Sequence, residues 1–258
     1  MSGDSPNAVR VGWSIVRAMR VRRPSPGGVQ TVDHDELGRV LEVLGRSGVP
    51  GLADERDQIH SYRSALESVD PDSLSRDEAL AFWLNLYNAG ALDIAAEAAA
   101  EMATTVLRVP GGFSRRWATV SGENLSLDDI EHGKIRRFRD PRIHGALVCG
   151  SASCPTLRSE PYRGDSLDDQ LEDQMRSFLA GGGAVYEEST DRLLLSRVFL
   201  WYGADFVRPT RMPTWIPASK RSISKAVSRW LTADLRQRVA GSATAFQSYD
   251  WGLACSIG

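Results

Sequence analysis

The chain has 258 residues, of which 42% are hydrophobic and 25% are charged, as is usual for a folded globular protein. Its formal net charge of −2 gives no general reason to expect a nucleic-acid partner. Three cysteines are too few for a disulfide framework and favour a reducing compartment, so we expect a cytoplasmic protein.

Residues 1–30 are predicted to form a basic N-terminal arm and linker. Their apolar residues are interrupted by Arg10, Arg17 and Arg20, so the arm has neither the unbroken apolar core of a signal peptide nor the length of a membrane span. A short helix packed on the protein, or a frayed arm, is favoured over a helix lying on a membrane.

Helices are predicted to dominate the first part of the chain. Apolar residues at helical spacing, Gly and Pro stops and Ser-x-x-Asp/Glu capping patterns predict helices at 33–44, 54–69, 76–103, 127–138 and 167–180. The three capping patterns are Ser75 with Glu78, Ser126 with Asp129 and Ser166 with Asp169.

Short strands are predicted later in the chain. "IHGALVC" (143–149) is an apolar run of strand length, 184–199 reads as a hairpin with its turn at 189–191, and 116–127 reads as a strand and turn. Helices followed by short strands indicate an α+β fold with a small antiparallel sheet, formed by one domain at 31–258.

Residues 131–154 contain half of the chain's histidines and two of its three cysteines. A zinc site at Cys149 and Cys154 is weakly supported, because no second Cys pair accompanies them. A permanent disulfide between these two cysteines does not suit a reducing compartment. In the third interpretation, His144 is a base and Cys154 a nucleophile, and Glu131 or His132 orients the base.

The order and spacing of these residues restrict the catalytic interpretation. No His follows Cys154, so a papain-like order of Cys before His is impossible. On a strand, His144 and Cys149 would face opposite sides. We therefore expect Cys149 to be the structural thiol and Cys154 the reactive one.

Two asparagines lie in the apolar stretch at 81–94. Asn85 and Asn88 are three residues apart and so share one helix face. Buried amides need hydrogen-bond partners, so the pair either bridges neighbouring backbone or lines a cleft, where it would hold a substrate or an oxyanion.

Residues 208–230 carry six basic side chains and no acidic one. A contact with a polyanion or a membrane surface would use this charge. A proline-rich loop leading into an amphipathic helix with a solvated basic face is favoured, because no array of stacking aromatic residues accompanies the charge.

The chain resembles the family known as domain of unknown function 547, over about 75–253. The matching motifs are "FWLNLYNA", "LSLDDIEHGKIR", "DPRIHGALVCGSASCPTLRSEPY", "LDDQLEDQMRSFL", "LLLSRVFLWYGADF" and "YDWGL". The resemblance implies a papain-like or transglutaminase-like cysteine-hydrolase fold. The recurrent polar positions that it implies are Asn85, Tyr87, Asn88, Glu131, His132, His144, Cys149, Cys154 and Asp250. Ala254 replaces an Asn that is usual in the family.

We therefore expect a soluble enzyme, a hydrolase or transferase of acyl- or amide-type chemistry, acting on a small molecule or peptide without a metal or cofactor. Asn85, Tyr87, Asn88 and Asp250 would bind the substrate, and nucleic acid and a membrane span are not expected. The alternative is a non-catalytic ligand- or protein-binding module that retains a degenerate hydrolase cleft.

Overall fold

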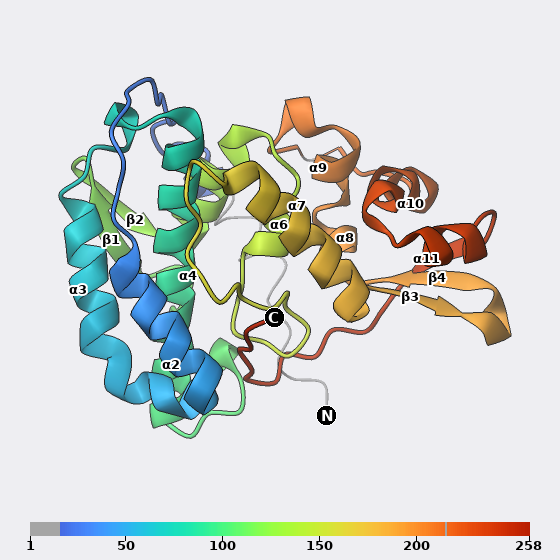
Figure 1. Ribbon diagram of the computed structural model, residues 1–258, viewed down its shortest axis with the longest axis horizontal. Coiled ribbons are helices and arrows are strands. Elements are labelled where there is room, and N and C mark those ends of the chain that lie inside the picture. Colours follow the sequence, from blue (N-terminus) through green and yellow to red (C-terminus); the bar gives the residue numbers. More distant parts are fainter. Residues whose placement is uncertain (1–15, 215) are drawn as a thin grey trace.

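The protein is described by a computed structural model that covers residues 16–214 and 216–258 (Figure 1). Its helices are α2 (Asp35–Gly51), α3 (Arg56–Glu67), α4 (Arg76–Ala100), α5 (Leu127–Asp129), α6 (Ile143–Ala146), α7 (Leu167–Phe178), α8 (Val198–Trp201), α9 (Gly203–Val207), α10 (Lys220–Val227) and α11 (Ala233–Arg238). Its strands are β1 (Arg116–Val120), β2 (Glu123–Ser126), β3 (Ala184–Glu187), β4 (Arg192–Leu195) and β5 (Ala243–Phe246).

Helix α4 is the central element of the larger hydrophobic core. Its sequence is apolar on every side, and its side chains are buried from Glu78 to Ala96, as expected for a helix enclosed by other elements. Helices α2 and α3 pack on it on the left of Figure 1. Gly90 lets the β1–β2 hairpin approach closely, since a Cβ there would lie 2.5 Å from Leu127 and 2.9 Å from the Trp117 ring.

The strands form two small sheets, which confirms the α+β class. β1 and β2 are an antiparallel hairpin, and the predicted hairpin at 184–199 is present as β3 and β4. The second sheet is mixed rather than antiparallel, because β5 joins β4 in parallel, with Arg192 opposite Ala243. A second hydrophobic cluster covers this sheet and includes side chains of α7, α8, α9 and α10.

The predicted strand at 143–149 is wrong. Residues 143–146 form the single helical turn α6, and only the residues after it are extended. The Asp140 side chain accepts a hydrogen bond from the Arg142 amide (2.9 Å), and the Gly145 amide bonds to the Arg142 carbonyl (2.9 Å), which together start a turn. No strand pairs with this segment in the described part of the chain, so its apolar residues are buried by helices instead.

Other predicted boundaries differ in smaller ways. α2 continues beyond Gly45 to Gly51, with a kink at Gly48, where φ is +62°. The Ser126–Asp129 capping box is confirmed. Ser166 does not cap α7, because its hydroxyl donates to Asp165 instead (3.0 Å).

The helix predicted at 127–138 is present but irregular. It begins as α5, widens into a π turn at Ile130–Lys134 and tightens into a 3₁₀ turn at Ile135–Phe138. A π turn inserts an extra residue and so rotates the side chains that follow it. All five residues of this π turn are buried.

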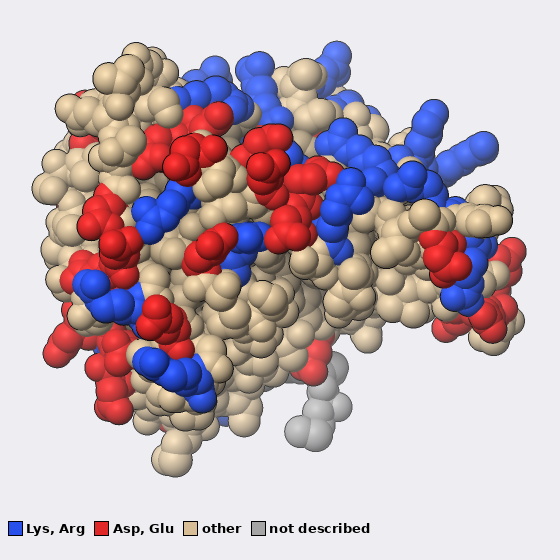
Figure 2. Space-filling model, viewed as in Figure 1, with Lys and Arg blue, Asp and Glu red and all other residues tan. Residues whose placement is uncertain are grey.

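The remaining predictions concern the chain's surface. Residues 1–15 of the basic arm lie outside the described residues, and Arg17 bonds to Ser126 (2.8 Å) and Asp129 (3.2 Å). α10 buries Ile223 and Val227, as predicted, and Figure 2 shows Lys and Arg gathering over α9 and α10. Within the described ranges, no helix is both long and apolar enough to cross a bilayer.

Candidate functional site

The polar residues that the sequence places between 131 and 154 separate into two clusters. We call the first the buried ionic network; it consists of Glu131, His132, Arg136, His144, Tyr202 and Asp205. We call the second the thiol cluster; it consists of Cys149, Ser151, Cys154 and Tyr249. Helix α6 carries His144, and the extended residues after α6 lead to Cys149.

Asp205 is the anion at the centre of the buried ionic network. It lies on α9 with 0% exposure and accepts hydrogen bonds from Arg136 Nε (2.8 Å), Arg136 Nη2 (3.0 Å) and His144 Nε2 (3.0 Å). Burial would raise the pKa of Asp205, but the bonds and charges of His144 and Arg136 outweigh it and lower the pKa to about 2. Asp205 is therefore ionised at neutral pH.

The π turn brings Glu131 and His132 into the same network. Tyr87 donates to Glu131 Oε2 (3.2 Å), and His132 Nδ1 lies 3.4 Å from both Glu131 Oε1 and Arg136 Nη1. Burial lowers the pKa of His132 to about 4, despite the opposing effect of Glu131. His132 is thus neutral at pH 7, and its Nδ1 accepts from the Arg136 guanidinium.

His144 is enclosed on several sides. Only 3% of it is exposed, its Nε2 bonds to Asp205, and its ring stacks on Tyr202 at a centroid distance of 4.0 Å. Phe206 packs against it at 5.7 Å. The charges of Arg136 and Asp205 compensate each other inside the network.

The thiol cluster is built on a tight loop. Gly150 has a φ of +77°, and the Cys154 amide bonds to the Ser151 carbonyl (3.0 Å), so the loop returns Cys154 to Cys149. A side chain at residue 150 would also meet Val106 at 2.8 Å. As a result, Cys154 Sγ accepts from the Cys149 amide (3.0 Å) and from Ser151 Oγ (3.5 Å).

Tyr249 reaches this loop from the segment after β5, which returns to the middle of the molecule in Figure 1. Its hydroxyl lies 3.3 Å from both Cys149 Sγ and Cys154 Sγ and 2.8 Å from Ser151 Oγ. Asp250 holds the segment in place, because its amide donates to Ser153 Oγ (2.8 Å) and its carbonyl accepts from the Ser153 amide (3.2 Å).

The two thiols have opposite acidities. Burial opposes ionisation of Cys154, but hydrogen bonds from Cys149, Ser151 and Tyr249 outweigh it and lower its pKa to about 6. The bond to Cys154, together with burial, raises the pKa of Cys149 well above its usual value. Both side chains are half-buried. A thiolate at Cys154 beside a neutral thiol at Cys149 is therefore the state at neutral pH.

Aromatic rings border the thiol cluster. Tyr249 packs against Trp251 (4.5 Å between centroids) and Trp201 (4.8 Å). Trp201 and Trp251 are stacked at 5.7 Å, and 45% of Trp201 is exposed. A partly exposed aromatic surface thus adjoins the residue whose hydroxyl bonds to both sulfurs.

Asn85 and Asn88 both bridge backbone segments. Asn85 donates to the Tyr162 carbonyl (2.8 Å) and accepts from the Tyr162 amide (3.0 Å). Asn88 donates to the Ala146 carbonyl (3.0 Å) and accepts from the Val148 amide (3.2 Å). Of the two interpretations made from the sequence, this geometry is the backbone-bridging one, and Asn88 fixes the segment that leads to Cys149.

No hydrogen bond joins a histidine to a cysteine within the residues that the structure describes, which include all four histidines and all three cysteines. Sequence reasoning missed Asp205, Tyr202, Ser151 and Tyr249. The first two lie in the motif "LLLSRVFLWYGADF", Ser151 lies in "DPRIHGALVCGSASCPTLRSEPY", and Tyr249 opens "YDWGL", so the matching motifs contained all four of them.

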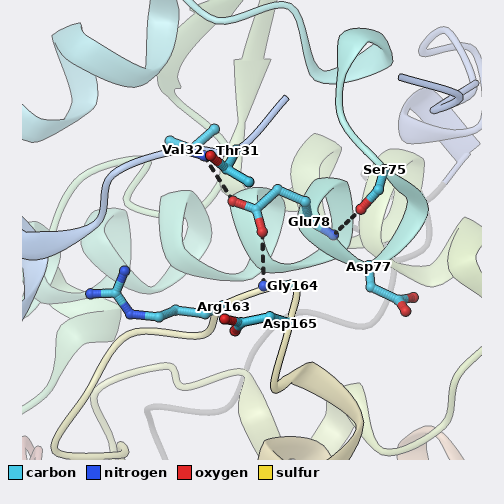
Figure 3. A pocket seen from close by; sticks show the side chains of 8 residues that line it. All are labelled: Thr31, Val32, Ser75, Asp77, Glu78, Arg163, Gly164 and Asp165. Atoms are coloured by element: carbon cyan, nitrogen blue, oxygen red, sulfur yellow. Dashed lines mark hydrogen bonds between the residues drawn. The ribbon is translucent and has the colours of Figure 1, made fainter. Parts of the chain in front are cut away.

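A cavity of about 450 Å³ lies elsewhere, at the start of α4 (Figure 3). The carboxylate of Glu78 reaches across it and accepts from the amides of Val32 and Gly164, both at 2.8 Å. This carboxylate therefore holds two loops together, and both of its oxygens already accept a hydrogen bond. None of the residues lining the cavity belongs to either polar cluster.

Between residues 16 and 258, position 215 excepted, no group of three or more His, Cys, Asp or Glu side chains is placed to hold a metal ion.

One comparison with known proteins identifies a relationship. The family model described as "Protein of unknown function, DUF547" matches residues 71–179, which run from just before α4 through the end of α7 and include Cys149 and Cys154. No curated protein and no solved structure matches the chain. The expected similarity to papain-like hydrolases therefore stays a prediction.

Proposed function

We propose that this protein, a member of the DUF547 family, is a cysteine-dependent acyl-transfer enzyme, with Cys154 as its nucleophile. The observation that carries the proposal is the set of donors around Cys154 Sγ: the Cys149 amide, the Ser151 hydroxyl and the Tyr249 hydroxyl. A thiolate is the nucleophilic form of cysteine, and these donors favour it without a neighbouring imidazolium.

The surroundings of Cys154 restrict the leaving group. No histidine of the described chain bonds to a cysteine, so an amine leaving group would have no imidazole to protonate it. Burial and the neighbouring thiols raise the pKa of Tyr249, which makes its hydroxyl a poor acid. A thioester or an ester, whose leaving group departs as an anion, fits this site better than an amide.

The reaction is then a two-step exchange. Cys154 Sγ attacks the acyl carbonyl carbon, the new C–S bond forms, and the bond to the leaving thiolate or alkoxide breaks. The leaving group takes its proton from water. Water or an acceptor nucleophile then attacks the acyl-enzyme and releases Cys154 as a thiolate.

The donors that hold the thiolate also suit the oxyanion of this reaction. When the sulfur becomes acylated it loses its charge, and the Cys149 amide and the two hydroxyls are left close to the carbonyl oxygen. Donors already in place for a developing charge are a large part of the rate enhancement in acyl transfer. In this arrangement Asn85 and Asn88 do not contact the substrate, because their side-chain amides are hydrogen-bonded to backbone groups.

The test has two measurements on the full chain. Iodoacetamide alkylation, followed by peptide mass spectrometry from pH 4.5 to 9, should give a half-maximal rate for Cys154 near pH 6. Incubation with p-nitrophenyl acetate and with a benzoyl thioester should leave one acyl group on Cys154. Cys154→Ser should abolish the acyl adduct, and Cys255→Ser should leave it unchanged.

The expected rate follows from two opposing effects. At pH 7 a thiol with a pKa near 6 is about nine-tenths ionised, whereas Cys255, with a pKa of about 12, is ionised to about one part in 100,000. The lower basicity of the Cys154 thiolate cancels part of this gain, so we expect alkylation about 100-fold faster than at Cys255. Equal alkylation rates at Cys154 and Cys255, with no acyl adduct, would refute the proposed enzymatic activity. The alternative, a non-catalytic binding module, would then be favoured.

A further inference from the structure

The two sulfurs of the thiol cluster share the hydroxyl groups of Ser151 and Tyr249 as partners. Ser151 Oγ lies 3.0 Å from Cys149 Sγ and 3.5 Å from Cys154 Sγ, and the Tyr249 hydroxyl lies 3.3 Å from both. The Cys149 amide also bonds directly to the Cys154 sulfur at 3.0 Å. Two thiols that share two hydroxyl partners, on one loop turned by Gly150, are placed to bond covalently with little movement of the chain.

We propose that Cys149 and Cys154 form a reversible dithiol–disulfide couple that is oxidised by a low-molecular-weight disulfide. This couple is a second activity of the loop, and it rests on the same sulfur as the proposed acyl transfer. It also regulates that activity, because a Cys154 sulfur held in a disulfide has no free thiolate. The loop therefore combines a nucleophile with the residue that can block it.

The oxidation proceeds in two exchanges. The Cys154 thiolate attacks one sulfur of RSSR; the Cys154–SR bond forms, the S–S bond of RSSR breaks, and RS⁻ leaves and is protonated. The Cys149 sulfur, losing its proton to water or to RS⁻, then attacks Cys154 Sγ and displaces a second RS⁻. In sum, two protein thiols are oxidised by two electrons, and RSSR is reduced to two RSH.

The environments of the two cysteines assign these roles. Cys154 receives the backbone and hydroxyl donors that favour a thiolate, so it attacks first. Cys149 holds its proton until the mixed disulfide forms beside it, because its bond to Cys154 and its burial raise its pKa. In the reverse direction Cys154 is the better leaving group, so an incoming thiol is expected to attack Cys149.

Cys255 is the one other candidate for the second thiol. It approaches the same loop, since a Cβ on Gly150 would lie 3.8 Å from its sulfur. Burial raises its pKa to about 12, and no hydrogen bond joins it to Cys149 or Cys154 in the described part of the chain. It therefore serves as the matched control in the experiment.

The experiment equilibrates the full-length protein at pH 7.5 in glutathione buffers of increasing oxidised-to-reduced ratio, followed by acid quenching and intact-mass and peptide analysis. The wild type should lose two hydrogens and carry no glutathione at the end point, with the disulfide mapped to Cys149 and Cys154. Cys149→Ser should stop at a glutathione adduct on Cys154. Cys255→Ser should behave as the wild type does.

Three results would overturn the couple: a wild type that keeps glutathione on Cys154, a disulfide between Cys154 and Cys255, or no change at any ratio. These readings use the wild type, so they do not depend on the folding of a variant. Acylation of Cys154 without disulfide formation would refute the couple alone. Disulfide formation without acylation would refute the proposed acyl transfer alone.

Discussion

The buried ionic network and the thiol cluster differ in how their charge is compensated. In the network, the Asp205 carboxylate is bonded to Arg136 and His144, and every member except the partly buried Tyr202 is buried. In the thiol cluster, the Cys154 thiolate has only neutral donors, and the site is half-buried. A charged group that is paired with an opposite charge does not readily change partners. A charged group that has only neutral hydrogen-bond donors can react with an incoming group.

This difference separates two tasks that the sequence places side by side. His144 and Cys149 are only five residues apart, yet one belongs to the network and the other to the thiol cluster. We infer that the network's main contribution is to fix α6 and α9 against each other. The proposed chemistry is assigned to the thiol cluster. Each prediction below tests one side of this division.

The largest effect is expected on the network side. Asp205→Ala would leave the Arg136 and His144 side chains buried without their anion, and breaking such a pair costs about 3–5 kcal/mol of unfolding free energy. Urea unfolding at pH 7 measures this. Asp168→Ala, which removes an ion pair with an 84% exposed carboxylate, should change stability by less than about 0.5 kcal/mol. Equal losses in the two variants would show that the network is not structural.

The second effect concerns acid stability. Burial holds the pKa of His132 at about 4, below the 6.5 of an unfolded chain, so the unfolded state binds the extra proton between these values. The stability that a neutral His132 contributes is complete above pH 6.5 and is lost as the pH falls through 4, to a total of about 3 kcal/mol.

Urea unfolding of the wild type and of His132→Gln from pH 7 to 4 tests this dependence. The variant should lose less stability over this range, because Gln does not titrate. His34→Gln is the matched variant outside the network, since burial also lowers the pKa of His34 to about 4. A pH dependence that is the same in the wild type and in His132→Gln would contradict the assignment.

The smallest effect is expected at the thiol cluster. Tyr249→Phe removes a hydroxyl from the Cys154 thiolate but keeps the ring that packs on Trp251. A hydrogen bond to a charged group contributes about 1.5–3 kcal/mol, so the midpoint of Cys154 alkylation should rise by about 1 pH unit or more. Tyr186→Phe, whose hydroxyl bonds to Asp191 at the surface, should leave the midpoint in place. An unchanged midpoint in Tyr249→Phe would show that the Tyr249 hydroxyl does not stabilise the Cys154 thiolate.

The sequence was most informative where local rules decide the structure. Helical spacing located α4, and the Ser126–Asp129 pattern located the cap of α5. The strand prediction at 143–149 failed because a short apolar run is equally compatible with a buried turn and with a strand. Periodicity does not distinguish the two; the Asp140 side chain that starts the turn lies just before the run.

The candidate site was only half visible in the sequence. Cys149, Cys154 and His144 stood out because chemically active residue types are concentrated there. Their partners come from far along the chain: Asp205 is 61 residues after His144, and Tyr249 is 95 residues after Cys154. Such contacts depend on how helices and loops pack together, and no local pattern records them.

The distance along the chain between Cys154 and Tyr249 also has a consequence during protein synthesis. A ribosome makes the chain from its N-terminus, so Cys154 leaves the exit tunnel before Tyr249 has been translated. Until then the sulfur lacks one of its hydroxyl donors, and the segment that holds Asp250 against Ser153 is missing. The nascent chain should therefore carry an ordinary, less acidic thiol, and its full reactivity would arise only after translation has passed Tyr249.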